Sequence, residues 1–219
     1  MTKKRLRVVL FGPQGCGKGT QGQLIADRFD VPLVGVGEMH RKEIAENTSL
    51  GKLVKQYVES GTLAPDEVTN AIVAKQMKRL DLSKGFVIDG YPRNVEQAIH
   101  LDRIAKVNLA INIKISDKES IRRLEGRVQC EACGQVYHLT DAPPIRKGVC
   151  VVCGRKLTKR SDDTEDIIRQ RLASYHFMTE PLVTYYRQRG VLLVINGEQP
   201  IPYVFEDVMK KTAKLGFSA

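Results

Sequence analysis

The amino-acid sequence predicts an α/β fold: a doubly wound, five-stranded parallel sheet with helices on both faces and two inserted lobes. Short apolar runs alternate with longer segments of helical periodicity along most of the 219 residues. One stretch, at about 127–163, interrupts this alternation and is rich in glycine, proline and cysteine. Strands that alternate with helices pair in parallel, so ligands are expected at the carboxyl ends of the strands.

Five short apolar segments are the predicted strands, because each is bounded by turn residues or leads into a helical pattern. They lie at 6–11, 32–34, 85–88, 109–115 and 191–195. A hydrophobic fraction of 42% is ample for the core that such a sheet requires.

The predicted helices follow from their start and stop signals. Ser116 and Glu119 have the spacing of a capping box, which predicts a helix that carries Arg122 and Arg123. Pro65 and the two acidic residues after it predict the start of another helix. Further helices are expected from about 19 to before 31, in two short pieces between 37 and 61, and from about 164.

The formal net charge of +10 favours polyanionic partners, either nucleic acid or small phosphorylated substrates. No apolar run approaches the ~18–20 residues that span a bilayer, and no export signal precedes the first strand. We therefore expect a cytoplasmic protein that does not bind a membrane. Nothing in the sequence requires more than a monomer.

A glycine-rich run, Gly12-Pro13-Gln14-Gly15-Cys16-Gly17-Lys18-Gly19-Thr20, directly follows the first strand. A strand, a glycine turn and a helix are the context in which backbone N–H groups surround a polyphosphate, and a lysine adds charge for its outer phosphates. The alternative is a glycine-rich connecting loop. Cys16 is either a reactive thiol at a helix start or a small residue tolerated in the loop.

Two cysteine pairs lie within the interrupting stretch, in the pattern C-x2-C-x16-C-x2-C. This spacing predicts a tetrahedral zinc site, for which a redox role of the pairs is the alternative. The predicted ligands are Cys130, Cys133, Cys150 and Cys153. Four thiolates leave no open position for a substrate, so the metal is expected to be structural.

Asp89 ends the third strand, where enzymes of this fold often place a carboxylate for magnesium, although aspartate there also caps turns. Arg123, Arg127, Arg160 and Arg171 lie on either side of the cysteine stretch. If that stretch folds over the glycine loop, these guanidinium groups converge on a transferring phosphoryl group. A solvated basic face is the alternative.

The sequence resembles the adenylate kinases, in the long form whose lid carries zinc. The motifs that carry the resemblance are the run from Gly12 to Gln21, the segment Asp89-Gly90-Tyr91-Pro92-Arg93 and the stretch from Arg160 to Asp163. The resemblance implies a core domain at 1–34, 65–126 and 164–219, a nucleoside-monophosphate lobe at 35–64 and a lid at 127–163. It also implies the transfer of a phosphoryl group from ATP to AMP, with Mg2+ on the ATP and Zn2+ in the lid.

The resemblance further implies roles by position. Residues that would hold ATP are Gly15, Cys16, Gly17, Lys18, Gly19, Thr20, Arg123, Arg127, Val136, Tyr137 and Gln199. Residues that would hold AMP are Val36, Arg41, Thr62, Leu63, Ala64, Gly90, Tyr91, Pro92, Arg93, Gln97, Arg160 and Arg171. Residues that would act in catalysis are Lys18, Arg93, Arg127, Arg160, Asp162 and Arg171.

One motif departs from the family. Gly35-Val36-Gly37-Glu38 stands where the family usually has Ser-Thr-Gly-Asp, so a threonine hydroxyl near the acceptor base is missing at Val36. Gln97 favours AMP, because its amide matches the edge of adenine. Val36 could instead be ordinary packing and Gln97 a surface amide.

Two other functions remain possible from the sequence: a kinase for UMP or CMP, and a nucleic-acid-binding NTPase with a zinc ribbon. Aromatic residues make up only 6% of the chain and tryptophan is absent, which disfavours base stacking on nucleic acid. His40, His100 and His176 are isolated, and no chemistry is predicted for them.

Overall fold

Five parallel strands form the main sheet, in the order β2-β3-β1-β4-β8, in a computed structural model that describes residues 5–217. The strands are β1 (Arg7–Phe11), β2 (Leu33–Gly35), β3 (Phe86–Asp89), β4 (Leu109–Lys114) and β8 (Leu192–Asn196). The central strand β1 pairs with β3 on one side and with β4 on the other. The predicted fold class is confirmed, and the strand order places the expected ligand edge at the carboxyl end of β1.

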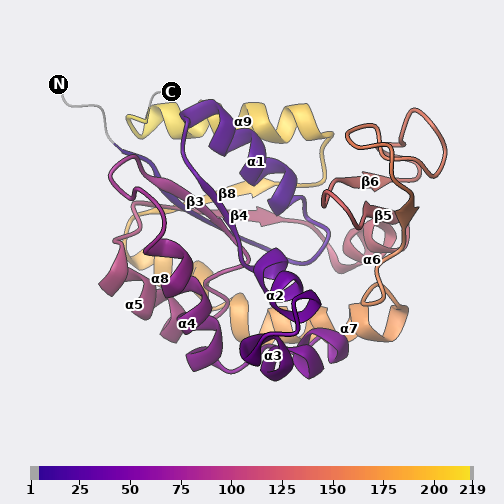
Figure 1. The fold of residues 1–219 in the computed structure, drawn as a ribbon. Helices are drawn as coiled ribbons and strands as arrows, with labels where there is room; N and C mark the ends of the chain where they lie inside the picture. Colours follow the sequence, from indigo (N-terminus) through magenta and orange to yellow (C-terminus); the bar gives the residue numbers. More distant parts are fainter. Residues whose placement is uncertain (1–4, 218–219) are drawn as a thin grey trace.

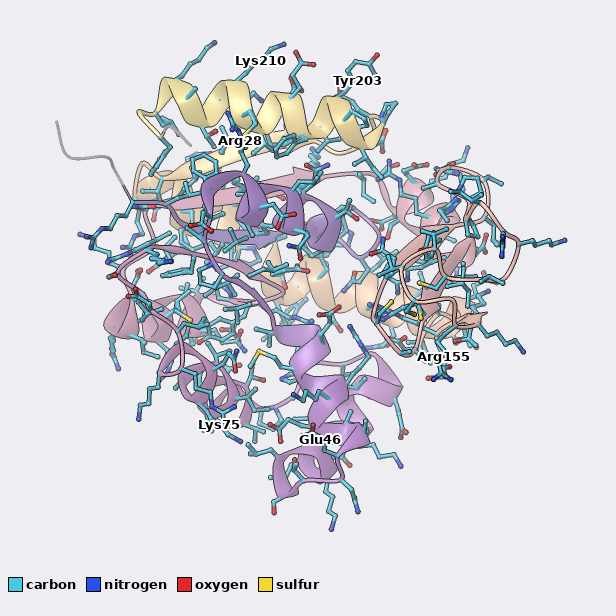
Figure 2. All side chains as sticks on the ribbon, turned by 45° about the horizontal axis from the view of Figure 1, so that its top comes forward. Arg28, Glu46, Lys75, Arg155, Tyr203 and Lys210 are labelled. Atoms are coloured by element: carbon cyan, nitrogen blue, oxygen red, sulfur yellow. The ribbon has the colours of Figure 1, made fainter. Side chains whose placement is uncertain are left out.

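One face of the sheet is covered by α1 (Lys18–Phe29) and α9 (Ile201–Lys214), as Figure 1 shows. Their apolar residues pack on alternate side chains of β1, since successive side chains of a strand point to opposite faces. The outer side of α9 carries Tyr203 and Lys210, which point to solvent (Figure 2). Within residues 5–217 no helix combines the length and the apolar character that crossing a membrane requires.

The opposite face is covered by α4 (Asp66–Met77), α5 (Val95–Ile104) and α8 (Leu182–Gln188) (Figure 1). Their buried side chains pack against Val9 and Phe11 of β1 and against neighbouring strands. The sheet therefore has a closed core on each face, and polar chemistry is left to its edge.

The predicted nucleoside-monophosphate lobe contains two short helices, α2 (Val36–Ala45) and α3 (Ser49–Ser60). They approach closely at Gly51, where an added Cβ would lie 2.0 Å from the carbonyl oxygen of Glu43. A small apolar cluster that includes Val54 and Ile72 joins α3 to α4. The lobe is thereby attached beside the edge of the main sheet.

The cysteine-rich stretch forms a separate antiparallel sheet with the order β6-β5-β7. Its strands are β5 (Arg127–Cys130), β6 (Val136–His138) and β7 (Leu157–Thr158). The chain enters it from α6 (Asp117–Glu125) and leaves it into α7 (Glu165–Ser174), which a π-helical turn, η1 (Tyr175–Thr179), continues. Buried Leu124, Ile168 and Leu172 pack together, so α6 and α7 form a paired base for the lid.

The predicted capping box at the start of α6 is wrong in one of its two hydrogen bonds. Ser116 Oγ accepts from the Glu119 amide at 3.4 Å, as expected. The Glu119 carboxylate does not return the bond, because it accepts from Arg122 and Arg123 instead. The Ser116 amide donates to Glu198 Oε1 at 2.7 Å, so a residue distant in sequence completes the cap.

Candidate active site

The glycine loop lies at the carboxyl end of β1 and leads into α1. Gly15 and Gly17 have φ of 78° and 93°, values that side-chain-bearing residues rarely adopt. An added Cβ at Gly12 would lie 2.3 Å from the Ile113 carbonyl oxygen, so only glycine fits there. Among residues 5–217, no side chain caps the start of α1, which leaves its first N–H groups free to bind an anion.

Lys18 covers this loop with its ammonium group. Its Nζ donates to the carbonyl oxygens of Gly12 and Pro13, each at 2.8 Å. Cys16 is 2% exposed and packs in the core beneath α1, which fits a small packing residue better than a reactive thiol. Gly19 and Thr20 are exposed at the mouth of the loop.

Asp89, at the end of β3, lies beside the loop. A Cβ added at Gly19 would be 3.4 Å from Asp89 Oδ2. Its other oxygen, Oδ1, is buried and has no hydrogen-bond partner among residues 5–217. Burial raises the pKa of Asp89, against the opposing effect of Lys18 and Arg93. An unpaired carboxylate oxygen next to a phosphate loop suits a hard cation such as Mg2+.

Arginines from several parts of the chain lie near one another, and two of them, Arg93 and Arg41, act on this carboxylate. Burial and then Arg171 lower the pKa of Arg93 to about 10. Burial, Arg127 and Arg41 lower the pKa of Arg160 to about 9. Each shift is caused partly by the charges of neighbouring guanidinium groups. A cluster of like charges attracts anions, and aspartates neutralise part of this one.

Two aspartates at the end of the lid hold part of this cluster. Asp163 accepts from Arg127 Nε at 2.7 Å and Nη2 at 2.5 Å, in the bidentate geometry that fixes both side chains. It also accepts from Arg171 Nη1 at 3.3 Å, and Asp162 accepts from the same atom at 3.2 Å. The Asp163 side chain is fully buried, and its bonds to Arg127 and Arg171 connect the start of the lid to α7.

A cavity lies between the main sheet and the predicted nucleoside-monophosphate lobe (residues 35–64), which is called the acceptor lobe below. It has an empty volume of about 620 Å³, which includes the open solvent at its mouth. Most of the predicted acceptor residues line it: Val36, Arg41, Thr62, Leu63, Ala64, Gly90, Arg93, Gln97 and Arg171.

Three predicted acceptor residues do not line the cavity. Tyr91 is fully buried, and its hydroxyl donates to Asn70 at 2.6 Å. Pro92 is also buried. The Arg160 side chain bonds to Gln129 within the lid.

Gln97 is 2% exposed, so the interpretation of a surface amide is wrong. Its Oε1 accepts from the Arg93 amide at 2.8 Å, and its Nε2 donates to Asp66 Oδ1 at 2.6 Å. These two bonds orient the amide and leave one N–H and one lone pair for a ligand. Val36 is 1% exposed and packs in the core as well as lining the cavity.

The lid approaches the acceptor lobe across this cavity. An added Cβ on Gly134, in the first cysteine loop, would lie 3.3 Å from Glu38 Oε1 of α2. Asp162, at the other end of the lid, lines the cavity together with residues of the lobe. The core, the lobe and the lid therefore each contribute residues to the cavity wall.

The predicted donor-nucleoside residues lie at two places. Arg123 lies between the glycine loop and the exit of β8, since its Cβ is near Gly15 and its Nη2 donates to the Gly197 carbonyl oxygen at 2.9 Å. Gln199 follows on that exit, where its amide donates to Asp207. In the lid, Val136 is 40% exposed, whereas the Tyr137 side chain is turned into the lid core.

The four lid cysteines form one cluster, with all four Sγ atoms within 4.8 Å of one another. The Sγ atoms of Cys130 and Cys153 are 3.4 Å apart, and those of Cys133 and Cys150 are 3.5 Å apart. These distances exclude disulfides and are near the edge of about 3.8 Å expected for a zinc–thiolate tetrahedron. The donor set fits zinc.

Comparison with known proteins gives the family. A family model described as adenylate kinase matches residues 10–191. This chain belongs to the adenylate kinase family. It is 44% identical over 210 residues to an adenylate kinase of Caldanaerobacter subterraneus, covering 94% of this chain and 95% of the relative. It is 45% identical over 204 residues to one from Acidothermus cellulolyticus, covering 91% and 94%, respectively.

A third relative, an adenylate kinase of Methanosarcina barkeri, is 40% identical over 216 residues, covering 95% of this chain and all of the relative. The predicted family, and with it the predicted class of nucleotide-binding kinase, are confirmed. Membership in the adenylate kinase family also accounts for the cavity and the arginine cluster next to a phosphate loop.

No role was predicted for His40, which lines the acceptor cavity. Asp163, in the predicted motif from Arg160 to Asp163, ties Arg127 to Arg171. A signal for His40 was available, because it lies four residues after Val36 and therefore on the same side of α2. No local signal distinguished Asp163 from Asp162.

Proposed function

We propose that this chain transfers the terminal phosphoryl group of ATP to AMP, reversibly, to give two ADP. The observation that carries the proposal is the group of arginines at the acceptor cavity: Arg93 and Arg171 line it, and Asp163 ties Arg127 to Arg171. Phosphoryl transfer requires mainly positioning and neutralisation of charge. A site with a phosphate loop, an acceptor cavity and cations beside them meets both needs.

The donor phosphates bind at the glycine loop, where the amides at the start of α1 and the Lys18 ammonium surround them. Lys18 leaves the carbonyl oxygens of Gly12 and Pro13 when phosphate oxygens replace them. Arg93 and Arg171 line the acceptor cavity, and Arg127 and Arg160 approach from the lid. Together they stabilise the charge that spreads over the transferring group.

Magnesium would be held near Asp89, whose unpaired Oδ1 suits it. When bound with ATP, the ion supplies positive charge to the donor oxygens. Asp89 itself acts as an acceptor of hydrogen bonds or as a ligand, and Lys18 opposes the rise in its pKa that burial causes.

The lid excludes water from the reacting phosphates. Its cysteine loop reaches Glu38 of the acceptor lobe, and its end contributes Asp162 to the cavity. Closing of this kind protects ATP from hydrolysis while the transfer proceeds. We further propose that the enzyme is monomeric and cytoplasmic.

Zinc in the lid is proposed to be structural. The buried apolar residues of the lid are few: Tyr137 and Leu157 pack with Cys130 and Cys150, and Val128 completes the cluster. A core of this size does not hold a fold by itself, so the metal takes its place.

The acceptor is proposed to be AMP. The free N–H and lone pair of Gln97 form a donor–acceptor pair, which matches a ring nitrogen and the amino group of adenine. The side chain of Val36 has no hydrogen-bond donor or acceptor and does not distinguish between bases. UMP and CMP are therefore the second candidate acceptors.

A coupled assay of ADP formation with ATP and a panel of monophosphates tests this choice. We expect AMP to give the highest kcat/KM of the panel, because the Gln97 amide pairs with its base. A preference for UMP or CMP would assign the chain to the other specificity. An absence of transfer to every monophosphate would overturn the proposed function itself.

The proposal also predicts no role in binding nucleic acid. The arginines gather inside a cleft and not along an exposed stripe. Mixed-sequence oligonucleotides are therefore expected to cause no mobility shift at physiological salt, measured by gel shift across a salt series. A shift that weakens steeply with salt would support the nucleic-acid-binding alternative.

A further inference from the structure

His40 has a setting that the phosphate chemistry does not use. Helix α2 places Val36 and His40 one turn apart, and both line the acceptor cavity. The residues that follow each of them, Gly37 and Arg41, line it as well. Arg41 approaches Gly37, since a Cβ added there would lie 3.5 Å from Arg41 Nη1. Helix α2 thus presents two rows of residues to the same cavity. One row contains Gly37 and Arg41, and the other contains Val36 and His40.

The ring of His40 is buried without a complete set of partners. The residue is 9% exposed, and its Nε2 makes no hydrogen bond to any group in the part of the chain that the structure describes. Buried polar atoms are nearly always paired in folded proteins. An unpaired nitrogen in the wall of a ligand cavity is explained if the ligand supplies the partner.

His40 is neutral at physiological pH. Burial, together with Arg93 and Arg41, lowers its pKa to about 4, and the opposing effect of Glu43 is smaller. A neutral imidazole adds no charge for a phosphate group. It offers one donor and one acceptor nitrogen, which are suited to a neutral, polar partner such as a base.

His40 also supplies a polar group near Val36, whose side chain has none. The side chain of Val36 lines the cavity but cannot form a hydrogen bond. His40 adds a polar group one turn along the same row of α2. Gln97 lies on α5, a different wall of the cavity, so the two side chains reach the ligand from separate elements.

We propose that Nε2 of His40 forms a hydrogen bond with the purine base of the acceptor nucleotide and thereby contributes to the choice of AMP over pyrimidine monophosphates. The inference rests on the proposed function, because it requires the acceptor to occupy this cavity. It assigns His40 to specificity and not to catalysis.

Equilibrium binding of nucleoside monophosphates without ATP tests the inference. His40→Leu should weaken AMP binding by about tenfold, the effect of losing one hydrogen bond, and should change UMP and CMP binding by less than about threefold. ATP binding should not change. His40→Gln, which keeps a polar group, should recover part of the loss. His100→Leu is the matched control, because His100 Nε2 is also buried and unpaired but does not line the cavity.

A second measurement uses the unaltered chain and does not depend on any variant folding. In 15N-histidine NMR spectra, titration with AMP should move the Nε2 resonance of His40 and leave that of His100 in place. An unmoved His40 resonance on saturation with AMP would overturn the inference. Equal losses for AMP, UMP and CMP in His40→Leu would do the same, since a contact to the base cannot act equally on all bases. If the unaltered chain binds no AMP at all, the proposed function fails. If it binds AMP without a change in the His40 resonance, only this inference is refuted.

Discussion

Replacing Arg93 by alanine is expected to lower kcat by at least ~10²-fold, because the site loses a preorganised cation next to the transferring phosphoryl group. Arg93 is positioned before any substrate binds: its Nε donates to the Gly90 carbonyl oxygen at 2.9 Å, and its amide donates to Gln97. Burial and the neighbouring Arg171 lower its pKa to about 10, so it remains charged at neutral pH. Steady-state kinetics with ATP and AMP measures the effect.

The controls separate charge from geometry and from stability. Arg93→Lys keeps a cation but loses the planar fork, so its kcat is expected to fall between those of the alanine variant and the unaltered enzyme. Arg28→Ala removes an exposed arginine on α1 that points away from the site (Figure 2), and it should leave kcat unchanged. Near-normal turnover in Arg93→Ala, with an unchanged melting temperature, would refute the role given to Arg93.

Removal of zinc is expected to lower the melting temperature by at least about 5 °C while turnover at low temperature is largely retained. The reason is the composition of the lid core, in which Cys130 and Cys150 are buried together with Tyr137 and Leu157. The Tyr137 hydroxyl contacts Cys150 Sγ at 3.4 Å and accepts from the Val151 amide at 3.0 Å, so the thiolates organise the residues around them. Chelation followed by thermal melting and by assays over a temperature series measures both effects.

A metal analysis provides the reference for this experiment, with one zinc per chain expected before chelation. Restoring zinc should restore the original melting temperature. An immediate loss of turnover at low temperature, in a protein whose circular dichroism spectrum is unchanged, would contradict a purely structural metal.

Local patterns predicted those parts of the molecule that depend on neighbours in sequence. The alternation of apolar runs with helical periodicity predicted the five strands, and four glycines with Lys18 predicted the phosphate loop. The spacing of the two cysteine pairs predicted their cluster, because each pair closes its own tight turn. Three helices that complete the two faces of the sheet, α5, α8 and α9, were not predicted.

Partners distant in sequence decided the rest. The cap of α6 is completed by Glu198, and no sequence motif near Ser116 predicts this contact. The orientation of the Gln97 amide depends on Asp66, 31 residues earlier in the chain. Tyr137 was predicted beside the donor nucleoside, yet its side chain packs among the lid cysteines.

The sequence by itself determined which chemistry this chain can perform, because a phosphate loop, a zinc cluster and a row of strands each arise from residues close together in the chain. Only the tertiary structure decided how these groups act on one another. The pKa of Arg93, the pairing of Asp163 with both Arg127 and Arg171, and the unpaired nitrogen of His40 are properties of side chains brought together from separate helices and strands. Burial and charge act through space, and the order of residues along the chain does not record the distances on which they depend.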